Sequence, residues 1–241
     1  MENTLYVGLS RQVVLRNNMN IIANNIANAN TPGYRSQNIM FKEYVSNPRG
    51  TDAPLSFVND IGQYHTTEQG AMKLTENPLN IALSGAGYMG VIGPDGKVAY
   101  TRAGDLEIST DGTLVTPAGH AISSAGGGSI SIPEDSTELK IDNKGVISNQ
   151  QGQIGQLMIV EFKNIQSLKP QGNNLYRTDE PGLPAEKTSV KQGYLEASNV
   201  QAVVEMTRMI DTLRTFQSVN QLMQNENERL RTAVQTLSRP T

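Results

Sequence analysis

Two histidines are the side chains in this sequence best suited to acid–base catalysis or metal binding. His65 and His120 lie far apart, each among small or polar residues and without an aspartate or glutamate at a metal-ligand spacing. The chain has no cysteine, which excludes thiolate nucleophiles, disulfides and cysteine ligands. We therefore predict no catalytic residues, no metal site and no cofactor, and interpret both histidines as surface or turn residues.

Three short segments partly match ligand-binding motifs. Gly85–Gly90 resembles a dinucleotide fingerprint, but it precedes a predicted strand instead of opening a helix. Asp142–Gly145 lacks the ligand series and the final glutamate of a calcium loop, and is interpreted as a hairpin turn. Thr101–Asp105 ends a predicted strand, and its arginine is expected to form an ion pair or cap the next turn.

Composition excludes several classes of partner. The 241 residues carry a net charge of -3, with 37% hydrophobic and 5% aromatic residues and no tryptophan. Such a chain has no positive field to hold nucleic acid, and it has few large side chains to fill one large core. No segment approaches the length of a membrane span, and Arg11 and Arg16 interrupt the N-terminal apolar pattern. We therefore expect neither a cleaved signal peptide nor a membrane anchor.

An amphipathic helix is predicted at the N-terminus, because apolar or small residues recur at alternating spacings of three and four. The helix should end near Asn30, since Pro32 disfavours helical backbone at Thr31 and Gly33 can adopt a positive φ. The stripe consists of Leu5, Gly8, Gln12, Leu15, Met19, Ile22, Ile26 and Ala29.

A heptad repeat from Ala202 to Leu237 predicts a long C-terminal helix of the coiled-coil type. Ser198 or Asn199 is predicted to cap its N-terminus, with Glu196 and Glu205 near the positive end of the helix dipole. Two series of core positions are predicted: Ala202, Met209, Phe216, Met223, Leu230 and Leu237 in one, and Met206, Leu213, Asn220, Asn227 and Val234 in the other.

The two helices are predicted to pack on each other and on neighbouring copies, because their narrow stripes suit helix–helix contacts better than contact with a sheet. A buried asparagine at a core position would fix the register at a cost in stability. The alternative is that both helices pack on the β domain of the same molecule. The predicted assembly residues are Leu15, Met19, Ile22, Asn24, Ile26, Asn28 and Asn30, then Met206, Met209, Leu213, Phe216, Asn220, Met223, Asn227 and Leu230.

Between the helices, glycine and asparagine turns separate short alternating segments, a pattern typical of antiparallel sheets. Turns are predicted at Pro94–Gly96 and Asn143–Gly145, and loops at Ala125–Gly128 and Pro181–Pro184. The segment Ser46–Gln69 has prolines, glycines and little periodicity, which predicts an extended linker or flexible loop. Strands are predicted at residues 80–83, 88–92, 98–102, 106–108, 114–116, 139–141, 146–148 and 156–162.

The predicted fold class is therefore α+β, with long N- and C-terminal coiled-coil-type helices flanking a mainly antiparallel β domain. We expect an N-terminal helix over 1–34, an extended segment over 35–72, a β-rich middle domain over 73–191 and a C-terminal helix over 192–241.

Segments at both ends and in the middle resemble those of bacterial flagellar rod, hook and hook-associated proteins. Ala23–Tyr34 is similar to the N-terminal signature of that family, and its turn consists of Thr31, Pro32, Gly33 and Tyr34. The other matching segments are Asn77–Ala82, Gly85–Tyr88 and Tyr100–Gly104 in the middle domain, and Gly193–Val200, Glu205–Met206 and Met209–Ile210 near the C-terminus.

The resemblance implies a structural subunit of the basal-body rod, the periplasm-spanning drive shaft, rather than an enzyme. It implies other rod proteins, further copies of the chain and the flagellar type III export apparatus as partners, with no nucleic acid and no small-molecule substrate. The chain length and the opening residues Met1–Ser10 favour the proximal rod over the distal rod. An extracellular β-domain binding module, trimerised by its C-terminal helix, is the alternative from another class.

Overall fold

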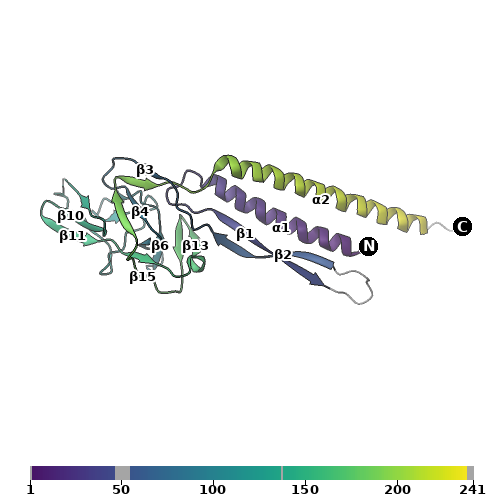
Figure 1. The fold of residues 1–241 in the computed structure, drawn as a ribbon, viewed down its shortest axis with the longest axis horizontal. Helices are drawn as coiled ribbons and strands as arrows, with labels where there is room; N and C mark the ends of the chain where they lie inside the picture. The colour runs from purple at the N-terminus through teal and green to yellow at the C-terminus, as the bar shows by residue number, and fades with distance from the viewer. Residues whose placement is uncertain (1, 47–54, 137, 238–241) are drawn as a thin grey trace. The chain divides into compact units, whose positions relative to one another are not determined.

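The computed structural model describes residues 2–46, 55–136 and 138–237 (Figure 1). Helices α1 (Glu2–Ala27) and α2 (Ala202–Leu237) flank a mainly antiparallel β region, so the α+β prediction is confirmed. Backbone contacts divide the chain into a helical unit of residues 1–27, 37–64 and 201–241 and a β unit of residues 28–36 and 65–200. No helix in the described ranges is long and apolar enough to cross a membrane.

In the helical unit, α1 and α2 pack antiparallel along their length (Figure 1). Gly8 lies against Met223 near one end of the pair, and Asn25 contacts Glu205 near the other end. A Cβ added at Gly8 would lie 3.1 Å from Met223 Cγ, so the glycine that weakens the helix also allows a close approach.

Strands β1 (Gln37–Ser46) and β2 (Leu55–His65) pair as a two-stranded sheet, and β1 packs on α1. The prediction of a linker or loop was therefore wrong for 55–65, while 47–54 lie outside the described residues. A two-stranded sheet is marginal alone, but β1 packs on α1, and Ile39 of β1 is buried. This tertiary contact is invisible to local periodicity.

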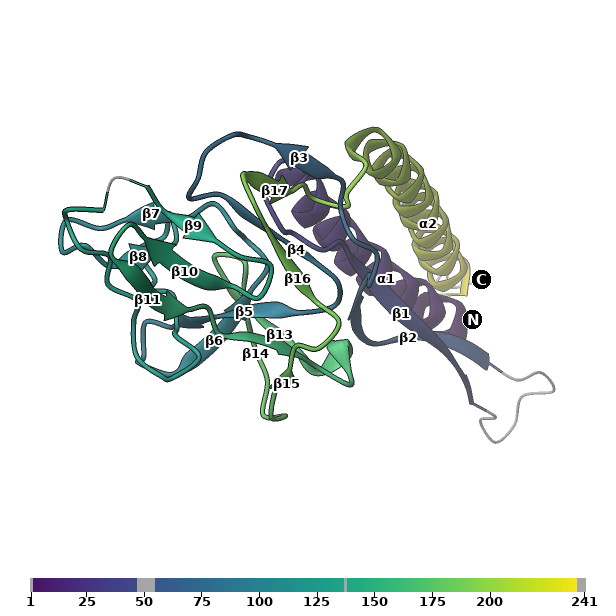
Figure 2. The ribbon, with the colours of Figure 1, turned by 60° about the vertical axis from the view of Figure 1, so that its left-hand side comes forward.

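The β unit is built around a six-stranded antiparallel sheet with the order β13-β14-β6-β5-β12-β15 (Figure 2). A three-stranded sheet has the order β11-β10-β9, and two-stranded pairs are formed by β4 with β16, β3 with β17, and β7 with β8. The strands are β3 (Met72–Leu74), β4 (Ile81–Ser84), β5 (Tyr88–Ile92), β6 (Val98–Thr101), β7 (Glu107–Ile108), β8 (Leu114–Val115), β9 (Lys140–Ile141), β10 (Val146–Asn149), β11 (Gly152–Gln156), β12 (Ile159–Glu161), β13 (Lys169–Gly172), β14 (Leu175–Arg177), β15 (Leu183–Pro184), β16 (Ser189–Gln192) and β17 (Tyr194–Glu196).

The core of the β unit has two parts. The larger is aliphatic and includes Ile81, Met89 and Ile122. The smaller is aromatic, with Tyr88, Phe162 and Tyr176 in edge-to-face contacts at centroid distances of 5.9 Å. Edge-to-face geometry suits the ring quadrupoles, so this part gains specific contacts beyond apolar burial.

The local predictions hold best where one hairpin forms a complete unit. The prediction for 88–92 coincides with β5, and the 94–96 turn places Gly96 at a φ of 74°. The predicted loop Pro181–Pro184 instead contains β15, and β3, β11, β13, β14, β16 and β17 were missed. Strands such as β16 and β17 pair with β4 and β3, more than a hundred residues away, so no turn signal marks them.

The predicted start of the C-terminal helix also needs correction. The helix begins at Ala202, so neither Ser198 nor Asn199 is its cap. Asn199 instead accepts a hydrogen bond from the Ser36 backbone at 2.8 Å, and Glu196 belongs to β17 rather than to the helix end. Only Glu205 lies in the first turn as expected.

Candidate functional site

The face of α2 that meets α1 uses only one of the two predicted series. Met209, Phe216, Met223 and Leu230 are half-buried, as that series requires. The other positions on this face lie one residue earlier than predicted: Glu205 and Thr212 are buried, and Val219 and Glu226 are half-buried. The residues of the other series, Met206, Leu213, Asn220, Asn227 and Val234, are exposed in the described chain, and their role in assembly stays a prediction.

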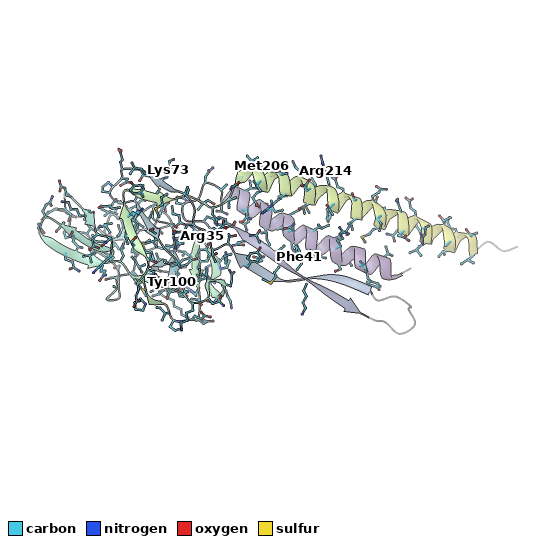
Figure 3. All side chains as sticks on the ribbon, viewed as in Figure 1. Arg35, Phe41, Lys73, Tyr100, Met206 and Arg214 are labelled. Atoms are coloured by element: carbon cyan, nitrogen blue, oxygen red, sulfur yellow. The ribbon has the colours of Figure 1, made fainter. Side chains whose placement is uncertain are left out.

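Two of these exposed residues, Met206 and Leu213, form an exposed apolar stripe on α2 together with Val203 and Ile210, and we define the stripe as Val203, Met206, Ile210 and Leu213. Their side chains are 78%, 51%, 50% and 43% exposed. Met206 projects from the helix in Figure 3. The stripe has helical spacing and is not covered by any described residue, so it is available to a neighbour.

The predicted residues of α1 fall into three groups. Ile22 is buried, and Leu15, Met19 and Ile26 are half-buried on the helical unit. Asn24 is exposed. In the β unit, Asn28 is half-buried and Asn30 exposed in the turn that follows the helix. Whether these residues contact neighbouring subunits stays a prediction.

Asn25 is the polar residue of α1 that sequence reasoning missed. It is only 1% exposed, and its amide donates to the Gln37 carbonyl at 2.9 Å while its oxygen accepts from the Gln37 N–H at 3.0 Å. Its amide also lies 3.2 Å from Glu205 Oε2, which places Asn25 between β1 and α2. The sequence could not single out Asn25, because Asn24, Asn28 and Asn30 lie close to it. Only the tertiary packing decides which of these four asparagines is buried.

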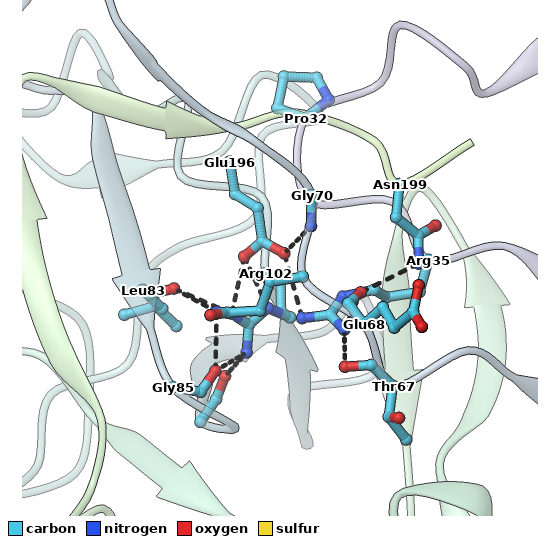
Figure 4. Close-up of polar contacts among 12 residues, drawn as sticks. Pro32, Arg35, Thr67, Glu68, Gly70, Leu83, Gly85, Arg102, Glu196 and Asn199 are labelled. Carbon is cyan, nitrogen blue, oxygen red and sulfur yellow. Dashed lines mark hydrogen bonds and ion pairs between the residues drawn. The ribbon is translucent and has the colours of Figure 1, made fainter. Parts of the chain in front are cut away.

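The β unit contains a buried ion cluster of Arg35, Arg102 and Glu196 (Figure 4). The Glu196 carboxylate accepts from Arg102 Nε at 2.9 Å and Nη2 at 2.7 Å, and from Arg35 Nη2 at 3.1 Å. Arg102 is also held by the backbone carbonyls of Leu83 and Gly85, each at 3.0 Å. The cluster joins three segments that are distant in sequence: Arg102 and Glu196 lie within family-like motifs, and Arg35 directly follows the Ala23–Tyr34 motif.

The three charged side chains of the cluster have little access to solvent. The side chains of Arg35, Arg102 and Glu196 are 4%, 0% and 1% exposed. Burial, and secondarily the guanidinium of Arg102, lower the pKa of Arg35, while Glu196 opposes that change. One carboxylate serves two cations, so removal of that carboxylate would leave uncompensated buried charge.

The predicted family turn lies directly beside this cluster. The Gly33 N–H donates to the Glu196 carbonyl at 2.7 Å, and the Asn174 amide donates to the Pro32 carbonyl at 2.8 Å. Gly33 has a φ of 67°, and an added Cβ would lie 2.4 Å from the Arg102 carbonyl carbon. Thr31 and Pro32 are half-buried, and Gly33 and Tyr34 are buried. The glycine is therefore required by both conformation and space.

The chemical motifs of the sequence have structural roles. His65, predicted at the surface, is 7% exposed, lies 5.3 Å from Tyr176 in an edge-to-face contact, and has a pKa lowered by burial. Gly85–Gly90 enters β5, and Asp142 accepts the Lys144 and Val146 backbone N–H groups of its turn, as expected. No group of three potential metal ligands occurs within the described ranges.

Comparison with known proteins places these features in a family. Residues 5–35 match the family model "Flagella basal body rod protein", residues 82–149 match "Flagellar hook protein FlgE/F/G D1 domain", and residues 191–236 match "Flagellar basal body rod FlgEFG protein C-terminal". The chain is 36% identical to the flagellar basal-body rod protein FlgF of Caulobacter vibrioides, with 99% of each chain covered. It is 33% identical to FlgG of Bacillus subtilis, with 97% of this chain and 98% of the relative covered.

The chain belongs to the flagellar basal-body rod protein family, whose members are structural subunits that assemble with other rod components. Within that family it is most like FlgF, because the identity is 36% with FlgF of Caulobacter vibrioides and 33% with FlgG of Bacillus subtilis. The resemblance inferred from the motif segments is therefore confirmed, and the chain is a component of the flagellar basal body.

Proposed function

We propose that the chain forms part of the proximal rod, where its helical unit assembles with copies of itself and with other rod proteins into a helical drive shaft. In this role it transmits torque through buried contacts and catalyses no reaction on a small molecule. The exposed stripe on α2 is the observation that carries the proposal, because a long helix with four outward apolar residues at helical spacing needs a partner in water.

The arrangement of the helical unit supports an open helical array. One face of α2 is occupied by α1 of the same chain, and the stripe lies on another face. Contact of the stripe with a different surface on the next subunit would be heterologous, and such contacts propagate as open helices unless the rotation closes a ring. A coiled-coil seam between subunits is part of this proposal.

We further propose that the chain reaches the rod through the flagellar type III export apparatus, without cleavage of a signal peptide. Support comes from Arg11 and Arg16, which interrupt the apolar pattern of α1 where a signal peptide would need a continuous apolar segment. The two relatives are rod proteins and match this chain over nearly their whole length, which favours this function over the trimeric binding module.

The test is complementation of a strain that lacks the gene, with Leu213→Asp as the variant. An aspartate at this stripe position would bury an unpaired charge in the contact, at a cost of several kcal/mol. The expected result is a soluble, folded protein with normal circular dichroism that fails to restore motility or complete rods.

Ser218→Asp is the matched control. Ser218 is exposed on the same helix, and its hydroxyl donates only to the Arg214 carbonyl of its own helix. This variant should restore motility. Normal rods with Leu213→Asp would show that the stripe is not part of the assembly, and a discrete trimer in sedimentation of the native chain would favour the binding module.

A further inference from the structure

We propose that Asp111 is a site of spontaneous modification, at which the backbone converts to an isoaspartate linkage, whereas the similarly placed Asp95 is protected. The sequence contains two Asp–Gly bonds, Asp95–Gly96 and Asp111–Gly112, and no Asn–Gly bond. Glycine has no side chain to hinder attack by its backbone nitrogen on the preceding aspartate, so these two bonds are the best suited to the reaction. The inference concerns the β unit and goes beyond the proposed role in the rod.

The reaction needs only the chain and water. The backbone nitrogen of Gly112 attacks the side-chain carbonyl carbon, Cγ, of Asp111. An N–Cγ bond forms, and the proton of the nitrogen leaves with the hydroxyl of the protonated carboxyl as water, which gives a five-membered succinimide ring. Water then adds to one of the two ring carbonyls and breaks its bond to the nitrogen. Opening at the backbone carbonyl leaves the chain running through Cγ, with one extra backbone carbon and a free α-carboxylate.

The two Asp–Gly bonds lie in turns of the same backbone geometry. Gly112 has a φ of 72°, and its N–H donates to the Ser109 carbonyl at 2.9 Å. Gly96 has a φ of 74°, and its N–H donates to the Gly93 carbonyl at 3.0 Å. Both glycines therefore present their nitrogen to the preceding aspartate in the same way, and the backbone does not distinguish the two sites.

The carboxylates of the two sites differ in their partners. Arg177 donates to Asp95 Oδ2 and Oδ1 at 2.9 and 2.7 Å, and the Lys97 N–H donates to Oδ1 at 3.3 Å. The hydrogen bonds from Arg177 are the main cause that lowers the pKa of Asp95, so the reactive protonated form is scarce. Asp111 is exposed, and its carboxylate forms no hydrogen bond or ion pair among the described residues. Its side chain can therefore turn toward Gly112, while Asp95 is held in place.

The modification should weaken the hairpin of β7 and β8, whose strands pair through Ile108 and Leu114 (Figure 2). Leu114 is 1% exposed in the aliphatic core. The Gly112 carbonyl accepts the Ile132 N–H at 2.8 Å, and an added Cβ would lie 2.9 Å from the Ile132 carbonyl oxygen. An extra backbone carbon at Asp111 lengthens the turn where there is little room, so it disturbs the pairing that buries Leu114.

The first experiment incubates the purified full chain at physiological temperature and pH. A protein isoaspartate methyltransferase with radiolabelled S-adenosylmethionine then tags the free α-carboxylate, and peptide mapping locates the tag. The Asp111 peptide should carry about fivefold or more of the label of the Asp95 peptide, because a charge-assisted pair holds only Asp95. Asp111→Glu is the control, since its ring would have six members and form far more slowly, so its label should fall to background.

The second experiment removes the protecting partner with Arg177→Met. Methionine keeps much of the apolar stem, and the lost pair is partly exposed, so the melting temperature should stay close to that of the native chain. Labelling of Asp95 should rise toward the level of Asp111. Labelling of Asp95 that stays low in this variant would exclude Arg177 as the protecting residue.

The native chain and a free peptide of residues 107–115 decide the rest. Equal labelling of Asp95 and Asp111 in the native chain would overturn the selectivity. Labelling of the peptide without labelling of Asp111 in the folded chain would show that the turn prevents ring closure, and would overturn the inference. Hydrogen exchange of β7 and β8 should be faster in the incubated native chain than in incubated Asp111→Glu, and equal exchange would contradict the weakened hairpin. These outcomes leave the proposed rod function untouched.

Discussion

Replacing Glu196 with glutamine probes the buried ion cluster with little change in volume. The amide oxygen can still accept two hydrogen bonds, as Glu196 Oε2 does from Arg102, but the NH₂ group then faces an N–H donor of Arg35 or Arg102. Two guanidinium groups remain almost fully buried, with no carboxylate between them. The variant therefore tests whether this one anion holds together the three segments that the cluster joins.

The expected loss of stability follows from the burial of the pair. Removing one partner of a buried ion pair costs about 3 to 5 kcal/mol, because the other charge stays desolvated. For a chain of this size each kcal/mol lowers the melting temperature by about 2 to 4 °C, so the fall should be about 6 to 20 °C. Such a loss is a large part of the total stability of a typical protein, about 5 to 15 kcal/mol.

Thermal and urea unfolding, followed by circular dichroism and tyrosine fluorescence, measure the effect. The matched control is Asp95→Asn, which removes the Asp95–Arg177 pair with the same shortest distance of 2.7 Å but with side chains 42% and 29% exposed. Because solvent screens an exposed pair, the control should unfold close to the native chain.

Equal losses of stability in Glu196→Gln and Asp95→Asn would refute the reasoning, because burial of the ion pair would then not affect the cost of removing its carboxylate. A double variant adds a second check. Combining Glu196→Gln with Arg35→Met removes one of the leftover charges, so it should recover part of the lost stability.

Three further predictions follow from single positions. Asn25→Ala should cost about 1 to 3 kcal/mol, because it leaves a buried β1 N–H and C=O without partners, while exposed Asn24→Ala should change stability little in the same urea titration. Gly33→Ala should destabilise the fold by more than the roughly 1 to 2 kcal/mol that a positive φ costs an alanine, because the added Cβ also clashes with Arg102. Gly126→Ala is the control, since an added Cβ there meets open space, and it should leave the melting temperature unchanged. Equal melting temperatures of the two variants would contradict the prediction. Burial lowers the pKa of His65 in the folded chain, so the unfolded chain binds more protons at mildly acidic pH. The free energy of unfolding should therefore fall as the pH drops from about 6.5 toward the lower folded pKa. His65→Phe should flatten this pH dependence, and an unchanged slope would argue against the prediction.

The C-terminal helix α2 shows which features the heptad pattern could predict and which it could not. The heptad over Ala202–Leu237 predicted the long helix α2, because apolar periodicity over many turns is a strong local signal, although the cap predicted for its start was wrong. It misplaced half of the face that meets α1, since the residues there include Glu205 and Thr212. Polar residues are acceptable at that contact because Asn25 and Asn18 provide hydrogen bonds from the other helix, at 3.2 and 3.4 Å.

The sequence by itself determined the α+β class, the two terminal helices, most hairpins of the β unit and the family, because each depends on local periodicity, turn residues or short motifs. Only the tertiary structure decided that Leu55–His65 pairs with β1, that Arg102 meets Glu196, and which face of α2 stays exposed. These features depend on partners up to about two hundred residues away along the chain. A buried charge, a two-stranded sheet or a polar helix contact is stable only when such a partner is in place.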